Sequence, residues 1–170
     1  MKVNRVVLDT NVLISALPSY QVAARKTLDI VRNHGTLIFS EEPFTELLTS
    51  LYRPKFDPYV TDNQRSEYLA NLIDMSKWIA IQNRAMGCRD SDDDNFLETA
   101  LISDADALIS GDSVLPVLEQ IGSIPILSVA DFLSNSVARI ILGESILRPL
   151  HYPQRIHEPC PLRQLIHPLW

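Results

Sequence analysis

Short apolar runs alternate with longer segments of helical periodicity along most of the chain. The short runs are rich in Val, Ile and Leu and end in polar or turn-forming residues, as buried strands of a parallel sheet do. The segments between them repeat apolar residues every three or four positions, which places those residues on one face of a helix. We predict strands at residues 5–8, 36–39, 78–81, 107–110 and 125–127.

Capping residues mark where several helices begin. Ser40, the two Glu residues after it and Pro43 together predict a helix start. Thr61 and Gln64 have the spacing of a capping box, which predicts a second helix that continues to about Ser76. Strands that alternate with helices form βα units, and the strands of such units are parallel. The sequence therefore predicts a three-layer α/β/α fold with a central parallel sheet of four to five strands.

This pattern ends near residue 142. We therefore assign residues 1–142 to the α/β domain and residues 143–170 to a proline-rich C-terminal arm. The arm contains five of the eleven prolines and three of the four histidines. Its prolines exclude a helix of normal length, but its Leu and Ile residues make it too apolar for a typical solvated linker. We expect the arm to pack on its own domain or on a partner.

Composition restricts the class of protein. The chain has 170 residues, of which 46% are hydrophobic and 21% are charged, as in a soluble globular domain. Its apolar runs are shorter than the roughly 20 residues that a membrane helix needs. Asp9 interrupts the N-terminal apolar run too early for a signal peptide, and two cysteines are too few for a disulfide framework. We expect a cytoplasmic protein that is not attached to a membrane.

Acidic residues are concentrated in one stretch of the chain. Between Asp90 and Asp112 there are eight acidic residues and no Lys or Arg, and the net charge of the whole chain is −6. This charge argues against a protein that holds nucleic acid by bulk electrostatics alone. It is compatible with a protein that meets a phosphate backbone through bound cations.

Four acidic residues stand at comparable places in the predicted fold. Asp9 and Asp112 each follow a predicted strand, whereas Glu46 and Asp93 lie in the first turns of predicted helices. In a parallel sheet, the carboxyl ends of strands and the amino ends of helices share the edge where ligands bind. Asp9 and Asp112 could instead cap helices, and Asp93 could complement a helix dipole. Glu46 could be a surface residue beside the apolar face of its helix, and the spacing alone leaves these alternatives open.

A cluster of all four carboxylates would need a counter-charge. Two carboxylates about 4 Å apart repel by roughly 4 kcal/mol at an effective dielectric constant of about 20. Oxygen-only ligands of this kind suit Mg²⁺ or Mn²⁺. Two such ions, about 3.5 to 4 Å apart, could activate a water molecule and stabilise the leaving oxygen of a phosphodiester.

These motifs resemble those of a known family. Residues 7–16, with the sequence VLDTNVLISA, are similar to the first motif of the PIN domain, which is the fold of many ribonucleases and of VapC-type toxins. Residues 40–48, 53–56, 89–97 and 105–112 match further motifs of the family in the same order. The resemblance covers about residues 3–133.

The resemblance implies a metal-dependent endoribonuclease with a quartet of acidic residues. The implied catalytic and metal-binding residues are Asp9, Glu46, Asp93 and Asp112, with Mg²⁺ or Mn²⁺ as the cofactor. The implied supporting residues are Asn11, which would orient Asp9 or a metal-bound water, Ser110, which stands where the family often has Thr, and Asp94. Because Asp92, Asp93 and Asp94 are adjacent, the ligand assignment in that motif could shift by one; Asp93 fits the spacing to Phe96 and Leu97.

The resemblance also implies partners. Close relatives of this type are toxins that an antitoxin protein holds inactive. We therefore expect an RNA substrate, a cognate antitoxin and a homodimer.

Two other functions compete with this interpretation. One is a PIN-like module that binds without catalysis, which the four acidic residues argue against. The other is a phosphatase in which Asp9 is the nucleophile. The haloacid-dehalogenase pattern requires an Asp at position 11, which is Asn11 in this chain, and no Lys is suitably placed.

Overall fold

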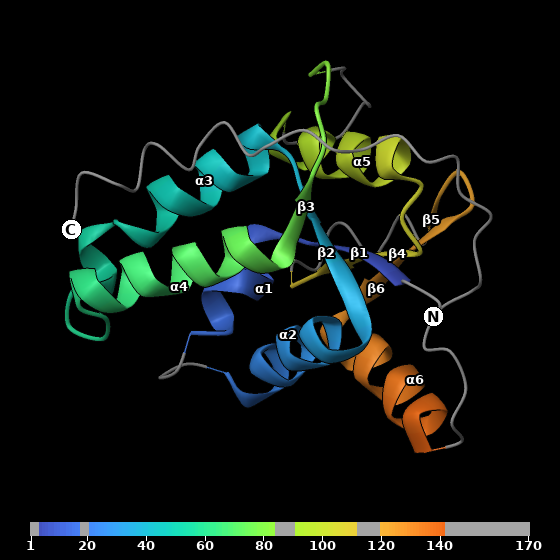
Figure 1. Cartoon of the computed structure of the whole chain (residues 1–170), viewed down its shortest axis with the longest axis horizontal. Coiled ribbons are helices and arrows are strands. Elements are labelled where there is room, and N and C mark those ends of the chain that lie inside the picture. Colours follow the sequence, from blue (N-terminus) through green and yellow to red (C-terminus); the bar gives the residue numbers. More distant parts are fainter. Residues whose placement is uncertain (1–3, 18–20, 84–90, 112–119, 142–170) are drawn as a thin grey trace.

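The fold was analysed in a computed structural model, which describes residues 4–17, 21–83, 91–111 and 120–141. Strands and helices alternate through these residues (Figure 1). The strands are β1 (Asn4–Leu8), β2 (Gly35–Phe39), β3 (Ser76–Trp78), β4 (Ala107–Ser110), β5 (Gln120–Ile121) and β6 (Ile124–Ser128). The helices are α1 (Thr10–Ser15), α2 (Val22–His34), α3 (Glu41–Leu51), the 3-10 turn η1 (Pro54–Phe56), α4 (Asp62–Met75), α5 (Ser91–Ser103) and α6 (Val129–Ile141).

The described strands form one sheet in the order β3-β2-β1-β4-β6-β5. Neighbouring strands from β3 to β6 are parallel, which confirms the predicted parallel sheet. The third strand begins at Ser76, two residues before its predicted start. Strand β5 was not predicted. It has only two residues and pairs antiparallel with β6 through a turn at Gly122, whose φ of +58° favours glycine.

Both faces of the sheet are covered, which confirms the three layers. On one face, alternate strand residues such as Val6, Leu37 and Ile109 join a core with α1, α2, α3, α4 and α6. On the other face, Val7 and Leu108 join a second core that α5 covers. Burial on both faces explains why the strands are continuous apolar runs in the sequence.

The connections between strands place a topological switch point at one edge of the sheet. The chain passes from β1 outward to β2 and β3, and then returns to β4 on the other side of β1. At such a switch point the loops after the two central strands diverge in opposite directions, and ligands bind between them. Asp9 follows β1 and Gly111 follows β4, so the switch point lies between two of the predicted motifs.

Two of the predicted helix starts differ in how they are capped. At α4 the capping box is present: the Gln64 amide donates to Thr61 Oγ1 and the Thr61 amide donates to Gln64 Oε1. At α3, Ser40 occupies the N-cap position, but its hydroxyl makes no hydrogen bond to an amide of the helix. That hydroxyl bonds to another helix instead.

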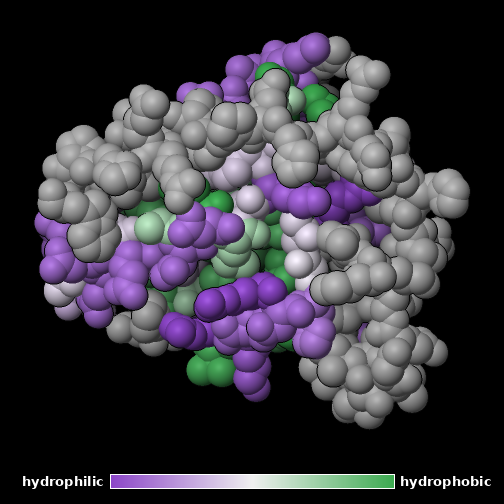
Figure 2. Space-filling model, viewed as in Figure 1, coloured by the Kyte–Doolittle hydropathy of each residue, from purple (hydrophilic) through white to green (hydrophobic). Residues whose placement is uncertain are grey.

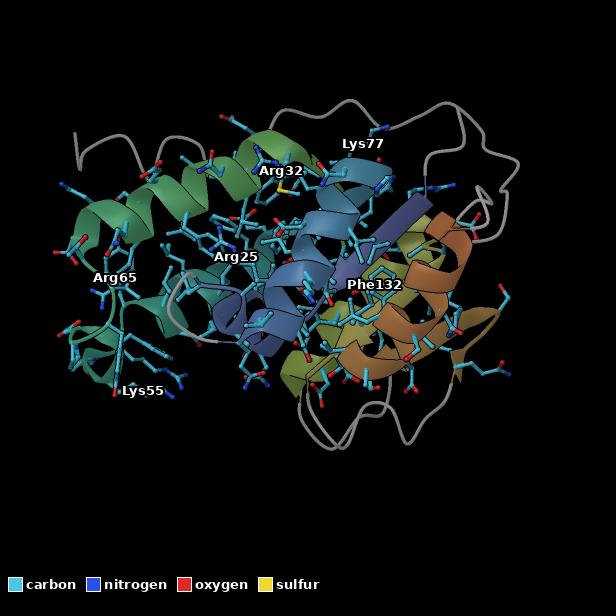
Figure 3. The ribbon with its side chains drawn as sticks, turned by 90° about the horizontal axis from the view of Figure 1, so that it is seen from below. Arg25, Arg32, Lys55, Arg65, Lys77 and Phe132 are labelled. Atoms are coloured by element: carbon cyan, nitrogen blue, oxygen red, sulfur yellow. The ribbon has the colours of Figure 1, made fainter. Side chains whose placement is uncertain are left out.

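A buried arginine fixes the connection between α3 and α4. The guanidinium of Arg65, which is labelled in Figure 3, donates to Asp57 at 2.7 Å and to Asp62 at 2.9 Å. It also lies over the ring of Tyr52. The side chain of Arg65 is only 4% exposed, whereas both carboxylates are mostly exposed.

The C-terminal part of the predicted domain is α6, which ends at Ile141. Residues 143–170, the predicted arm, lie outside the described residues, so the arm and the boundary at residue 142 remain predictions. Within the described ranges, none of the helices has the length and apolar character needed to span a membrane.

Candidate acidic site and its surroundings

The carboxylate of Asp9 is held in one orientation at the switch point. Asp9 follows β1, is 4% exposed and is the N-cap of α1. Its Oδ1 accepts a hydrogen bond from the Val12 amide at 2.8 Å. Its Oδ2 accepts one from the Gly111 amide at 3.0 Å and another from the Ser110 hydroxyl. The carboxylate therefore joins β1, α1 and the end of β4.

The residues after β4 lie directly against the first turn of α1. A Cβ atom placed on Gly111 would be 3.4 Å from the Cβ atom of Asn11 and 3.5 Å from a methyl group of Val12. Asn11 is exposed, as expected for a side chain that could meet a ligand, whereas Ser110 is 1% exposed. Of the three predicted supporting residues, Ser110 thus acts on Asp9 through its hydroxyl, and Asn11 faces solvent beside Gly111. The third, Asp94, is buried.

Glu46 and Asp93 lie on two helices that approach this edge. Glu46 is half-buried in α3, and α3 packs against both α1 and α5 (Figure 1). Asp93 is half-buried in the first turn of α5, and the adjacent Asp94 is buried. One turn further along α5, the buried carboxylate of Glu98 accepts a hydrogen bond from the Gln82 amide at 3.1 Å, which ties the segment after β3 to this helix.

The fourth predicted acid, Asp112, lies outside the described residues, and so does the side chain of Asp92. Among the residues that are described, no three His, Cys, Asp or Glu side chains are close enough to hold one metal ion. The described structure therefore places Asp9, Glu46 and Asp93 on elements that are in contact, but it does not assemble a metal site from these three alone.

Sequence reasoning missed the backbone donors of the site. The amides of Val12 and Gly111 orient Asp9, and amides carry no residue-specific signal. The glycine after a strand was the one available indication, because a residue without a side chain lets two backbones approach closely.

A groove lies between α1, α2 and α4, and the sequence did not predict it. It has a volume of about 290 Å³ and lies at the carboxyl end of α1, whereas Asp9 caps the amino end. Leu17, Leu28 and Leu72 line it, and Arg25 and Arg32 of α2 project beside it (Figure 3). Figure 2 looks onto this face, where hydrophobic residues lie between the hydrophilic residues of α2 and α4.

Tyr68 of α4 also lines this groove. Its hydroxyl donates to the Leu13 carbonyl at 2.7 Å, near the carboxyl end of α1. Burial raises the pKa of the Tyr68 phenol well above its usual range, so the hydroxyl stays protonated and remains a donor.

Comparison with models of protein families identifies the family of this chain. A model of the PIN domain family matches residues 5–113. The chain belongs to the PIN domain family. The matched residues include Asp9, Glu46, Asp93 and Asp112, and they end just after β4. A search of curated proteins finds no significant match.

A solved structure supports the PIN fold independently. A chain in the crystal structure of VapBC2 from Rickettsia felis, bound to a DNA fragment from their promoter, is similar to this chain with a TM-score of 0.50. The two chains are 13% identical, and the similarity covers 73% of this chain and 98% of the other. At this identity the likeness concerns the fold, and it confirms the predicted VapC-like architecture. Family and fold together support assignment to the nuclease class of hydrolases.

Proposed function

We propose that this PIN domain protein is a divalent-metal-dependent endoribonuclease and the toxin of a toxin–antitoxin pair. The observation that carries the proposal is the position of Asp9. This buried carboxylate is fixed by three donors at the switch point of the sheet, where parallel α/β folds bind their ligands. Helices that carry Glu46 and Asp93 approach the same edge, as the predicted acidic quartet requires.

The donor chemistry fits Mg²⁺ or Mn²⁺. The proposed ligands are Asp9, Glu46, Asp93 and Asp112, all of which offer carboxylate oxygen, the ligand type that these hard cations prefer. Asp93 is favoured over Asp94 because Asp93 has the family spacing to Phe96 and Leu97. When bound, the metal would lower the pKa of a water molecule and stabilise the leaving oxygen of the phosphodiester.

The protein residues contribute orientation. The Ser110 hydroxyl and the Gly111 amide hold Oδ2 of Asp9, and the Val12 amide holds Oδ1, so the carboxylate does not need to reorganise when a ligand arrives. The exposed side chain of Asn11, beside Gly111, is positioned to hydrogen-bond a water molecule or an RNA oxygen at this edge.

A protein partner, the antitoxin, is the second part of the proposal. The similar Rickettsia felis chain belongs to a VapBC2 assembly, which supports an antitoxin for this chain too. The groove between α1, α2 and α4 is the surface that we assign to it. Apolar residues in the groove with charged residues beside them suit an amphipathic peptide segment, which buries its apolar face in such a groove. We also propose that the protein is a homodimer in the cytoplasm.

Cleavage of RNA with and without divalent metal tests the proposed activity. Wild-type protein should cut single-stranded RNA in Mg²⁺ or Mn²⁺ and should lose this activity in EDTA. Glu46→Gln and Asp93→Asn should each lower the rate about 100-fold, since even indirect partners of metal ligands change metal affinity about 10- to 100-fold. Glu67→Gln is the matched control, because it removes an exposed carboxylate from α4 and should leave the rate unchanged.

Metal binding gives a second measurement that does not depend on cleavage. Mn²⁺ at about 100 times its Kd should stabilise the wild-type fold by about 2.7 kcal/mol, or roughly 5 to 10 °C in Tm. If RNA binds but is not cut under any metal condition, the protein is a binding module and the enzymatic proposal is wrong. If Mn²⁺ leaves Tm unchanged, the assignment of a metal-binding site to these acidic residues is wrong.

A further inference from the structure

Two fully buried hydroxyl groups connect the helices that carry Glu46 and Asp93. Ser40, the N-cap residue of α3, and Thr99 of α5 are both 0% exposed. Their hydroxyl oxygens are 2.6 Å apart, and Thr99 also donates to the Asn95 carbonyl at 2.6 Å. Because a hydroxyl has one proton and Thr99 uses its proton on Asn95, Ser40 is the donor in the bond between the helices.

This bond replaces a local interaction that Ser40 would ordinarily make. A serine at an N-cap usually accepts a hydrogen bond from an amide of its own helix, and Ser40 makes no such bond. Its hydroxyl donates to Thr99 of α5 instead. The side chain of Ser40 therefore contacts a helix distant in the sequence and does not cap its own helix.

Among the described residues, the buried apolar side chains of α3 and α5 belong to two separate cores. The buried apolar residues of α3, such as Phe44 and Leu47, belong to the core on one face of the sheet. Those of α5, such as Phe96 and Ala100, belong to the core on the other face. The two helices touch where they pass the edge of the sheet (Figure 1), and the Ser40–Thr99 bond lies at this contact.

We infer that Ser40 and Thr99 are positioning residues, which set the relative placement of Glu46 and Asp93 and thereby the metal affinity of the acidic site. The inference rests on the proposed function. Glu46 lies six residues beyond Ser40, and Asp93 lies six residues before Thr99, which is about 9 Å along each helix axis. A tilt of about 5° about the hydroxyl pair would move either carboxylate by about 0.8 Å at that distance, whereas metal–ligand distances tolerate only about 0.2 Å.

Mn²⁺ binding to full-length variants, measured by calorimetry, tests this role. Ser40→Ala removes the bond between the helices and leaves the Thr99 hydroxyl bonded to Asn95. Thr99→Val removes the same bond with little change of shape. Both variants should raise the Kd for Mn²⁺ about tenfold, at the lower end of the range for partners of metal ligands. Thr99→Ser keeps the hydroxyl and should remain within about twofold of wild type.

Thr27→Val is the matched control. Thr27 is also 0% exposed, and its hydroxyl donates to the Ala23 carbonyl within α2, so it joins no second helix. The substitution should lower Tm as other buried Thr→Val changes do, but it should leave the Kd for Mn²⁺ unchanged. RNA cleavage at saturating Mn²⁺ should be largely restored in Ser40→Ala, because the change weakens metal binding and leaves the carboxylates in place.

The outcomes separate the two proposals. If the wild type binds neither Mn²⁺ nor Mg²⁺, the proposed function fails, and the positioning role fails with it. If the wild type binds Mn²⁺ and Ser40→Ala binds it as tightly as Thr27→Val, the proposed function stands and the positioning role is wrong. Should Thr99→Val fail to fold, Ser40→Ala alone decides, since it leaves no buried donor without an acceptor.

Discussion

Asp9→Asn is the substitution that removes the central carboxylate with the smallest change of shape, and the structure predicts that it also weakens the fold. An ionised carboxylate accepts at both oxygens, whereas an amide accepts only at its oxygen and donates at its nitrogen. Oδ2 of Asp9 faces the Gly111 amide and the Ser110 hydroxyl, and Oδ1 faces the Val12 amide. In either orientation of Asn, its NH₂ group therefore meets a backbone N–H.

The cost follows from the burial of these groups. Asp9 is 4% exposed, so water cannot readily replace the lost acceptor. A buried donor without an acceptor costs about 1 to 3 kcal/mol, and bonds to a charged acceptor lie toward the upper part of that range. We expect Asp9→Asn to lower the free energy of unfolding by about 2 to 3 kcal/mol in EDTA, or Tm by roughly 4 to 12 °C.

Two further variants separate lost hydrogen bonds from lost charge. Asp93→Asn removes one carboxylate from the first turn of α5, where the interaction with the helix dipole accounts for at most about 1 kcal/mol. Ser110→Ala removes a single donor to Asp9 and should cost about 1 kcal/mol. Chemical denaturation of all four proteins in EDTA measures these differences. If Asp9→Asn proves as stable as the wild type and Asp93→Asn, the three hydrogen bonds to the Asp9 carboxylate do not stabilise the fold.

Two other predictions concern residues away from the acidic edge. Burial raises the pKa of Asp106, so its contribution to stability is fully present below its ordinary pKa of 3.8 and is lost as pH rises through the raised value. Urea denaturation from about pH 4 to about pH 7 should therefore show the wild type losing stability relative to Asp106→Asn. Parallel pH dependences of the two proteins would contradict this prediction. Asp57→Asn and Asp62→Asn should each lower the free energy of unfolding by less than about 1 kcal/mol, because both carboxylates are exposed. The double variant should lower it by about 3 to 5 kcal/mol, because the buried guanidinium of Arg65 then has neither carboxylate. Additive losses in that double-mutant cycle would show that the second carboxylate does not compensate for the first.

The sequence predicted most of the fold because its signals are local. The buried strands are continuous apolar runs, and the capping box of Thr61 and Gln64 marks the start of α4 in both sequence and structure. Strand β5 was missed because a two-residue strand has no periodicity, and its pairing depends on the turn at Gly122. The third strand was placed two residues late because Ile79 and Ile81 extend the apolar run beyond the paired residues.

The site was predictable only in part, since its geometry is made by long-range contacts. The sequence located Asp9 and Ser110, but not the hydrogen bond between them, which joins residues 101 positions apart. Ser40 was recognised as a helix cap, and its bond to Thr99 was not foreseen because no local rule brings two hydroxyl groups from separate helices together. The groove beside α4 depends on the packing of three helices, so no single segment indicates it.

Helix α1 illustrates why the acidic site depends on the whole domain. It has six residues, too few for a helix that is stable alone. Its amino end is capped by Asp9, which is itself held by Ser110 and Gly111 after β4, and near its carboxyl end the Leu13 carbonyl accepts from Tyr68 of α4. Both ends are thus fixed by segments that come later in the chain. The orientation of the Asp9 carboxylate can therefore form only after β4 has paired with β1, so substitutions at that pairing should disturb the acidic site even when they are far from it in sequence.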